Sequence, residues 1–63
     1  MEDLLVRLEE VLEICQAKYY LSCYTERVLY ALYQVNAGPL DESQEYEIKE
    51  LIENIHFDFE LNN

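Results

Sequence analysis

An apolar stretch in the middle of the chain, residues 24–35, constrains the fold more than any other feature. Its sequence is YTERVLYALYQV. At about 100° per residue, a helix here carries Val28, Leu32 and Val35 on one side and spreads Leu29 and Tyr33 onto another. A helix that is apolar around most of its circumference must be covered on at least two sides. The flanking segments are therefore expected to pack around it.

The segment before this stretch predicts a first helix over residues 2–20. Leu4, Leu8, Val11 and Cys15 recur at helical spacing, and no glycine or proline interrupts them. Between residues 18 and 25 the phase of the apolar positions shifts. Two interpretations remain open: a turn, with Ser22 or Thr25 capping a new helix over residues 22–36, or one continuous helix that shows different faces to different neighbours.

Residues 36–40 are the clearest break in the chain. Gly38 is suited to closing a helix and Pro39 to ending one. Asp41 and Gln44 have the spacing of a capping box for a third helix over residues 41–55. In residues 56–63 apolar and polar residues alternate, which predicts an extended tail.

These elements predict an all-α fold, either a small helical hairpin or a three-helix bundle. A chain of 63 residues buries only about 60% of the surface that its unfolded form exposes. Oligomerisation, most simply a homodimer, or a partner chain is therefore expected to complete the core.

The charge balance limits the classes of partner. Fourteen acidic and four basic residues give a net charge of −10, so direct binding to nucleic acid or to anionic membrane surfaces is not expected. Basic protein surfaces are the expected partners. Neither a secretory signal nor a membrane span is predicted, so a cytoplasmic location with reduced cysteines is expected.

Two sets of residues are candidates for partner binding. Carboxylates crowd the predicted third helix, where they could cover a basic surface or imitate nucleic-acid phosphates; the alternative is a solvated face that keeps the protein soluble. Tyrosines crowd the middle of the chain and favour a partner or dimer interface, although tyrosines at the rim of a core would give the same pattern. The acidic candidates are Glu42, Glu45, Glu47, Glu50 and Glu53, and the aromatic candidates are Tyr19, Tyr20, Tyr24, Tyr30 and Tyr33.

The tail supplies two further candidates, Phe57 and Phe59. In an extended tail they could add a strand to the open edge of a partner's sheet, or one of them could simply pack into the core. No metal site, cofactor or catalytic residue is predicted, because two cysteines, one histidine and one glycine supply neither a closed metal site nor a phosphate-binding loop.

The predicted function is that of a non-catalytic protein-binding module. It would be a small acidic inhibitor or neutraliser that covers a basic surface, such as a nucleic-acid-binding surface, of another protein. The alternative is a structural or adaptor subunit of a homo- or hetero-oligomeric assembly, in which the charges only maintain solubility.

Overall fold

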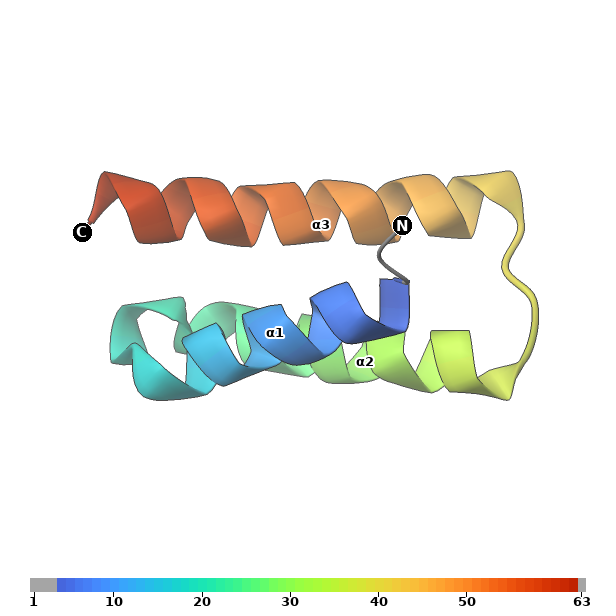
Figure 1. Ribbon diagram of the computed structural model, residues 1–63, viewed down its shortest axis with the longest axis horizontal. Helices are drawn as coiled ribbons and strands as arrows, with labels where there is room; N and C mark the ends of the chain where they lie inside the picture. The colour runs from blue at the N-terminus through green and yellow to red at the C-terminus, as the bar shows by residue number, and fades with distance from the viewer. Residues whose placement is uncertain (1–3, 63) are drawn as a thin grey trace.

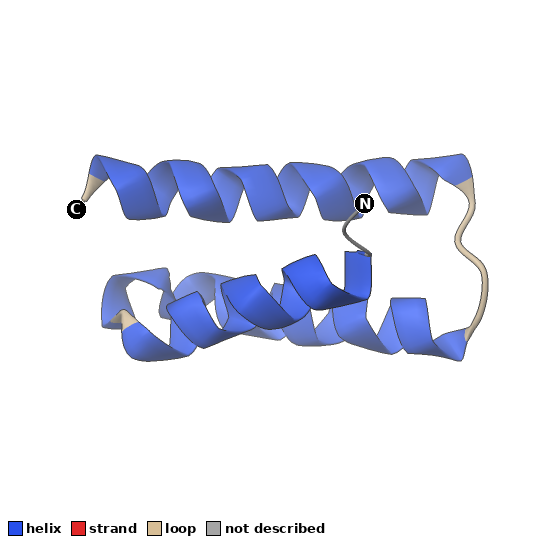
Figure 2. Cartoon of the chain, viewed as in Figure 1, coloured by secondary structure: helices blue, strands red, loops and turns tan. Residues whose placement is uncertain are grey.

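The computed structural model of the protein describes residues 4–62. Its elements are α1 (Leu4–Ala17), the 3₁₀-helix η1 (Tyr19–Tyr24), α2 (Thr25–Ala37) and α3 (Glu42–Leu61). The protein is a small all-α bundle, and the described residues contain no strand (Figure 2). Helix α2 runs antiparallel to α1 and α3, and α1 packs against both of the other helices (Figure 1).

The chain turns at Lys18, so residues 4–37 contain two α-helices and not one. Lys18 has extended backbone angles, φ −118° and ψ 108°, which any residue can adopt, so the turn needs no glycine. The predicted first helix therefore ends three residues early, at Ala17. After the turn, η1 directs Leu21 into the core, where it is 1% exposed. The shift in the phase of the apolar positions between residues 18 and 25 reflects this change in the direction of the chain.

Helix α2 begins without the cap that the sequence suggested. Tyr24 is its N-cap residue, and no side chain makes a capping hydrogen bond there. Neither Ser22 nor Thr25 acts as a side-chain cap, because η1 leads directly into α2. The backbone of the 3₁₀-helix thus provides the start that a capping side chain would otherwise provide.

The connection between α2 and α3 has the predicted chemistry. Gly38 follows α2 with φ 153°, a conformation that side chains disfavour. The predicted capping box is present: the Gln44 N–H donates to Asp41 Oδ1 at 2.8 Å, and the Asp41 N–H donates to Gln44 Oε1 at 3.1 Å. Two backbone donors at the start of α3 are therefore satisfied.

The predicted extended tail is wrong, because α3 continues through it to Leu61. The alternation of apolar residues has a helical explanation: Ile55 and Phe59 are four residues apart and share the core face, while Phe57 and Leu61, also four apart, share the opposite face. Ile55 is fully buried, whereas Phe57 and Leu61 are 65% and 71% exposed. A period of two over a few residues was too short to distinguish a strand from a helix with two apolar faces.

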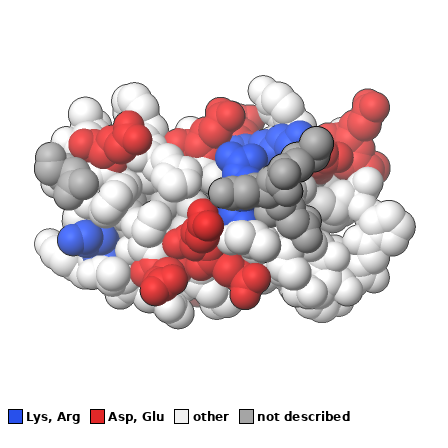
Figure 3. Space-filling model, in the orientation of Figure 1, with Lys and Arg blue, Asp and Glu red and all other residues white. Residues whose placement is uncertain are grey.

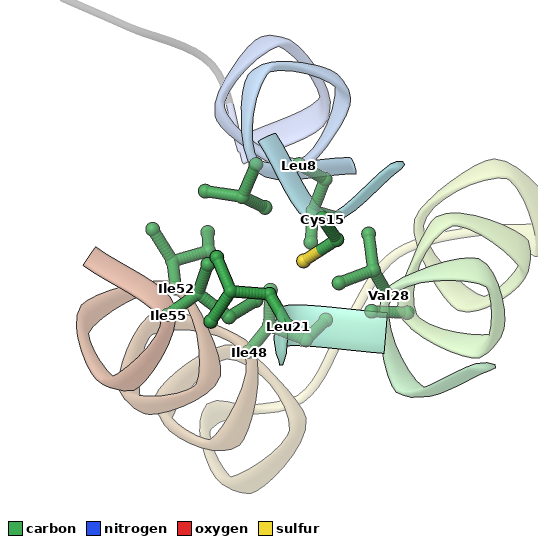
Figure 4. Packing of buried hydrophobic residues seen from close by; sticks show 9 residues of the cluster. Leu8, Cys15, Leu21, Val28, Ile48, Ile52 and Ile55 are labelled. Carbon is green, nitrogen blue, oxygen red and sulfur yellow. The ribbon is translucent and has the colours of Figure 1, made fainter. Parts of the chain in front are cut away.

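The core lies between the three helices and η1 and is entirely apolar (Figure 4). Helix α3 contributes isoleucines at helical spacing, and α1 contributes a leucine, a valine and a cysteine. No polar or charged residue is buried in the described part of the chain. The buried residues are Leu8, Val11, Cys15, Leu21, Val28, Ala31, Ile48, Ile52 and Ile55. None of the helices between residues 4 and 62 is long and apolar enough to cross a membrane.

Candidate protein-binding surface

Helix α2 presents an exposed aromatic pair. The rings of Tyr30 and Tyr33 stack with their centroids 6.5 Å apart and an interplanar angle of 24°. The two residues are 62% and 69% exposed, and the neighbouring Leu29 is 50% exposed. The core-facing residues Val28 and Ala31 occupy the opposite side of the same helix. The stacked pair therefore presents contiguous aromatic area to solvent.

The other candidate tyrosines lie elsewhere. Tyr19 and Tyr20 belong to η1, at the opposite end of the bundle from the loop between α2 and α3 (Figure 1). Both tyrosines are exposed. The five tyrosines therefore do not form one continuous surface.

Tyr24 makes an internal contact. Its hydroxyl donates a hydrogen bond to Asp58 Oδ2, joining the start of α2 to the last turns of α3. This hydrogen bond, together with partial burial and the negative charge of Asp58, raises the pKa of Tyr24 to about 12. The phenol is held in its neutral, donating form.

The candidate carboxylates of α3 separate into two groups. Glu47 and Glu50 face the side of α3 next to α2, where both line a groove. Glu45 is partly buried and forms an ion pair with Lys49, whose Nζ lies 3.1 Å from Glu45 Oε1. Glu42 and Glu53 are exposed outside that groove. Acidic residues also appear as several separate groups on the face seen in Figure 3.

The groove between α2 and α3 has a volume of about 570 Å³, and α1 contributes no residue to its lining. Its floor is apolar: Ala31 and Ile48 are each 3% exposed, and Leu51 is partly buried. Its walls and rims are polar and aromatic. They are formed by Glu26, Arg27, Tyr30 and Gln34 of α2 and by Glu47, Glu50 and Asn54 of α3.

A second hollow extends the groove toward the loop between α2 and α3. It has a volume of about 380 Å³ and shares Tyr30 and Gln34 with the first. Tyr33 and Leu40 also line it. The two hollows therefore adjoin at Tyr30 and Gln34.

Part of this surface is not predicted from the sequence. The unpredicted groove residues are Arg27, Gln34 and Asn54, and Tyr46 of α3, outside the groove, is also exposed. These residues could have been found from their helical positions. Once the buried faces of α2 and α3 are known, each of these residues falls outside the buried face. Tyr46 also borders a small hollow with Glu42 and Glu47 on α3.

The two phenylalanines of the tail have different environments. Phe57 is 65% exposed, whereas Phe59 packs against the core. A helical Phe57 cannot add a strand to a partner's sheet in this conformation, because its backbone hydrogen bonds are already made within α3.

The cysteines are both free thiols. Cys15 is buried, and burial together with the nearby Cys23 raises the pKa of its thiol, which disfavours the reactive thiolate. Cys23 is exposed. Residues 4–62 contain no group of three or more histidine, cysteine or carboxylate side chains placed to hold a metal ion.

In comparisons with known proteins, no family model, curated protein or solved structure matches this chain.

Proposed function

We propose that this protein is a non-catalytic binding module that covers a basic surface of another protein, in the manner of a small inhibitor or neutraliser. The observation that carries the proposal is the α2/α3 groove, which combines a buried apolar floor, an exposed tyrosine and three carboxylates. Interfaces that bind proteins share this composition: apolar and aromatic groups at the centre, with polar groups at the rim.

Electrostatics support a basic partner. A net charge of −10 on 63 residues attracts basic surfaces over distances of about one Debye length, about 8 Å at physiological salt. Among the described α3 carboxylates, Glu45 forms an ion pair with a basic side chain, that of Lys49. The carboxylates that remain available for partner cations are Glu42, Glu47, Glu50 and Glu53. A nucleic-acid-binding surface is one basic surface of this kind. The predicted cytoplasmic location belongs to the same proposal.

The test is capture of partners from the native host on immobilised protein, followed by mass spectrometry at several salt concentrations. Glu-to-Gln substitution at positions 42, 45, 47, 50 and 53 should release the captured protein, as should raising the salt. A partner that still binds the variant with all five Glu-to-Gln substitutions, and that still binds at high salt, would contradict the proposal.

A structural or adaptor subunit is the second candidate, favoured by the exposed apolar residues of α2 and α3. These are Leu29, Tyr30, Tyr33, Tyr46, Phe57 and Leu61, each at least half exposed. Under this alternative the protein forms a homodimer or a larger assembly through these side chains. Sedimentation equilibrium of the wild-type protein and of Tyr33→Ala and Phe57→Ala would then show dissociation on substitution, whereas the five-fold Glu-to-Gln variant would assemble normally.

A further inference from the structure

We infer that the α2/α3 groove takes an amphipathic helix with basic flanks from the partner protein. This inference rests on the proposed function and specifies it. It names the element of the partner that is recognised and the surface of this chain that recognises it.

The length of the groove fits a helix of about two turns. Its lining on α2 runs from Glu26 to Gln34, which at about 1.5 Å per residue is about 12 Å. Two turns of a guest helix cover the same length and place apolar side chains at i, i+4 and i+7 on one face. These side chains would lie over Ala31, Ile48 and Leu51.

The arrangement of the bundle favours a helix over an extended peptide. Helices α2 and α3 run antiparallel with little direct contact between their backbones, and α1 packs against both. The groove is lined by α2 and α3 alone, so a guest helix there would become a fourth member of the bundle. An extended peptide would need free backbone donors or acceptors at an open edge, and both walls of the groove are helices.

The charges at the rim select basic flanks on the guest. Glu26 stands on the α2 side, and Glu47 and Glu50 stand on the α3 side, all exposed. Lysine or arginine on either side of an apolar stripe would meet these carboxylates. Arg27 lines the same groove and opposes such a guest, so its removal should strengthen binding.

The test uses a defined probe. A fluorescein-labelled helical peptide of about 18 residues carries leucines at i, i+4 and i+7 with lysines flanking them; a scrambled peptide of identical composition is the control. Fluorescence anisotropy gives the affinity for the full-length protein. NMR amide shifts give the site, which should centre on Tyr30, Gln34, Leu51 and Asn54.

Matched variants distinguish the effect of groove residues on peptide affinity from the effect of the protein's net charge. Gln34→Lys should weaken binding by about tenfold or more, and Glu47→Gln with Glu50→Gln should weaken it similarly. The same changes of charge on α1, Gln16→Lys and Glu9→Gln with Glu13→Gln, should have effects of less than about twofold. Circular dichroism of each variant confirms that the bundle is folded.

A gain of affinity is the most demanding outcome. Arg27→Gln should strengthen peptide binding, and the α1 substitution Arg7→Gln should strengthen it less. Circular dichroism shows whether each variant is folded, so a gain confined to a folded Arg27 variant supports the groove directly.

Several outcomes would overturn the inference: equal affinity for the scrambled peptide, equal effects of groove and α1 variants, or amide shifts centred outside the groove. The proposed function would survive these results if host proteins were still captured in a salt- and carboxylate-dependent manner. Retention of those proteins by the five-fold Glu-to-Gln variant would instead overturn the proposed function, whatever the peptide does.

Discussion

At the scale of single residues, Tyr24 joins two parts of the chain that lie 34 positions apart. Its hydroxyl donates to the Asp58 carboxylate across the partly buried contact between the start of α2 and the end of α3. Hydrogen bonds to charged groups are stronger than neutral ones, and partial exposure reduces their net effect. This side chain was predicted as part of an interface, and the structure shows it binding the chain to itself.

Tyr24→Phe removes this hydrogen bond and keeps the ring. We expect the free energy of unfolding to fall by about 1–2 kcal/mol, measured by urea denaturation at pH 7. Tyr33→Phe is the matched control, because Tyr33 is 69% exposed, and its effect should stay within about 0.5 kcal/mol. Equal effects of the two substitutions would show that the Tyr24 hydroxyl is not a stabilising group.

The raised pKa of Tyr24, about 12 against an ordinary value of 10.0, predicts a pH dependence of stability. A group whose pKa is higher in the folded state stabilises that state fully below its unfolded pKa and ceases to do so as pH rises through the folded value. The stability difference between wild type and Tyr24→Phe should therefore be constant up to about pH 10 and shrink between pH 10 and 12. A difference that does not change across this range would contradict the assignment.

At the scale of elements, α3 combines a buried face with an exposed aromatic face. Phe59 packs against the core, and Phe57, two residues earlier, points to solvent. A helix predicts unequal roles for the two side chains, whereas an extended tail lying across the bundle or away from it does not fix which is buried.

Phe59→Ala should lower the free energy of unfolding by about 2 kcal/mol, less than a fully buried phenylalanine costs. Phe57→Ala should change it by less than about 0.5 kcal/mol. Urea denaturation of both variants is the measurement. Comparable losses from the two substitutions would be incompatible with α3 continuing to Leu61.

Much of each element could be predicted from the sequence, and the exceptions have local causes. The repeated spacing of Leu8, Val11 and Cys15 predicts α1, and Gly38 with Asp41 predicts the loop before α3, because these residues favour particular backbone geometries. The turn at Lys18 leaves no such mark, since its extended conformation is open to any residue.

The candidate surface was less predictable than the fold. Glu47 and Glu50 could be placed on one flank of a helix from their spacing, but their position across from Glu26 depends on how α2 and α3 are arranged around α1. Long-range packing of this kind is not encoded in local periodicity. The groove therefore could not be predicted from the sequence and is defined only by the three-dimensional structure.

At the scale of the whole molecule, the excess of negative charge opposes the compact state through self-repulsion. We expect sodium chloride to raise the melting temperature between about 10 mM and 500 mM, because screening shortens the Debye length. A recovery of about 1 kcal/mol would raise it by about 4–8 °C in a domain of this size. The exposed Lys49–Glu45 pair loses little by screening, so a melting temperature that falls with salt would contradict this account.

The absence of buried polar groups from the described interior has a consequence for how the sequence can vary. With neither directional bonds nor charges to satisfy inside, the packing requirement is one of volume and shape, and aliphatic residues of similar size are interchangeable there at a cost of less than about 1.5 kcal/mol each. At the fully buried Leu8, Ile52 and Ile55, substitution is therefore limited to aliphatic side chains of similar volume. The side chains that distinguish this small protein from others therefore lie on its surface. The apolar core holds the helices that carry them in fixed positions.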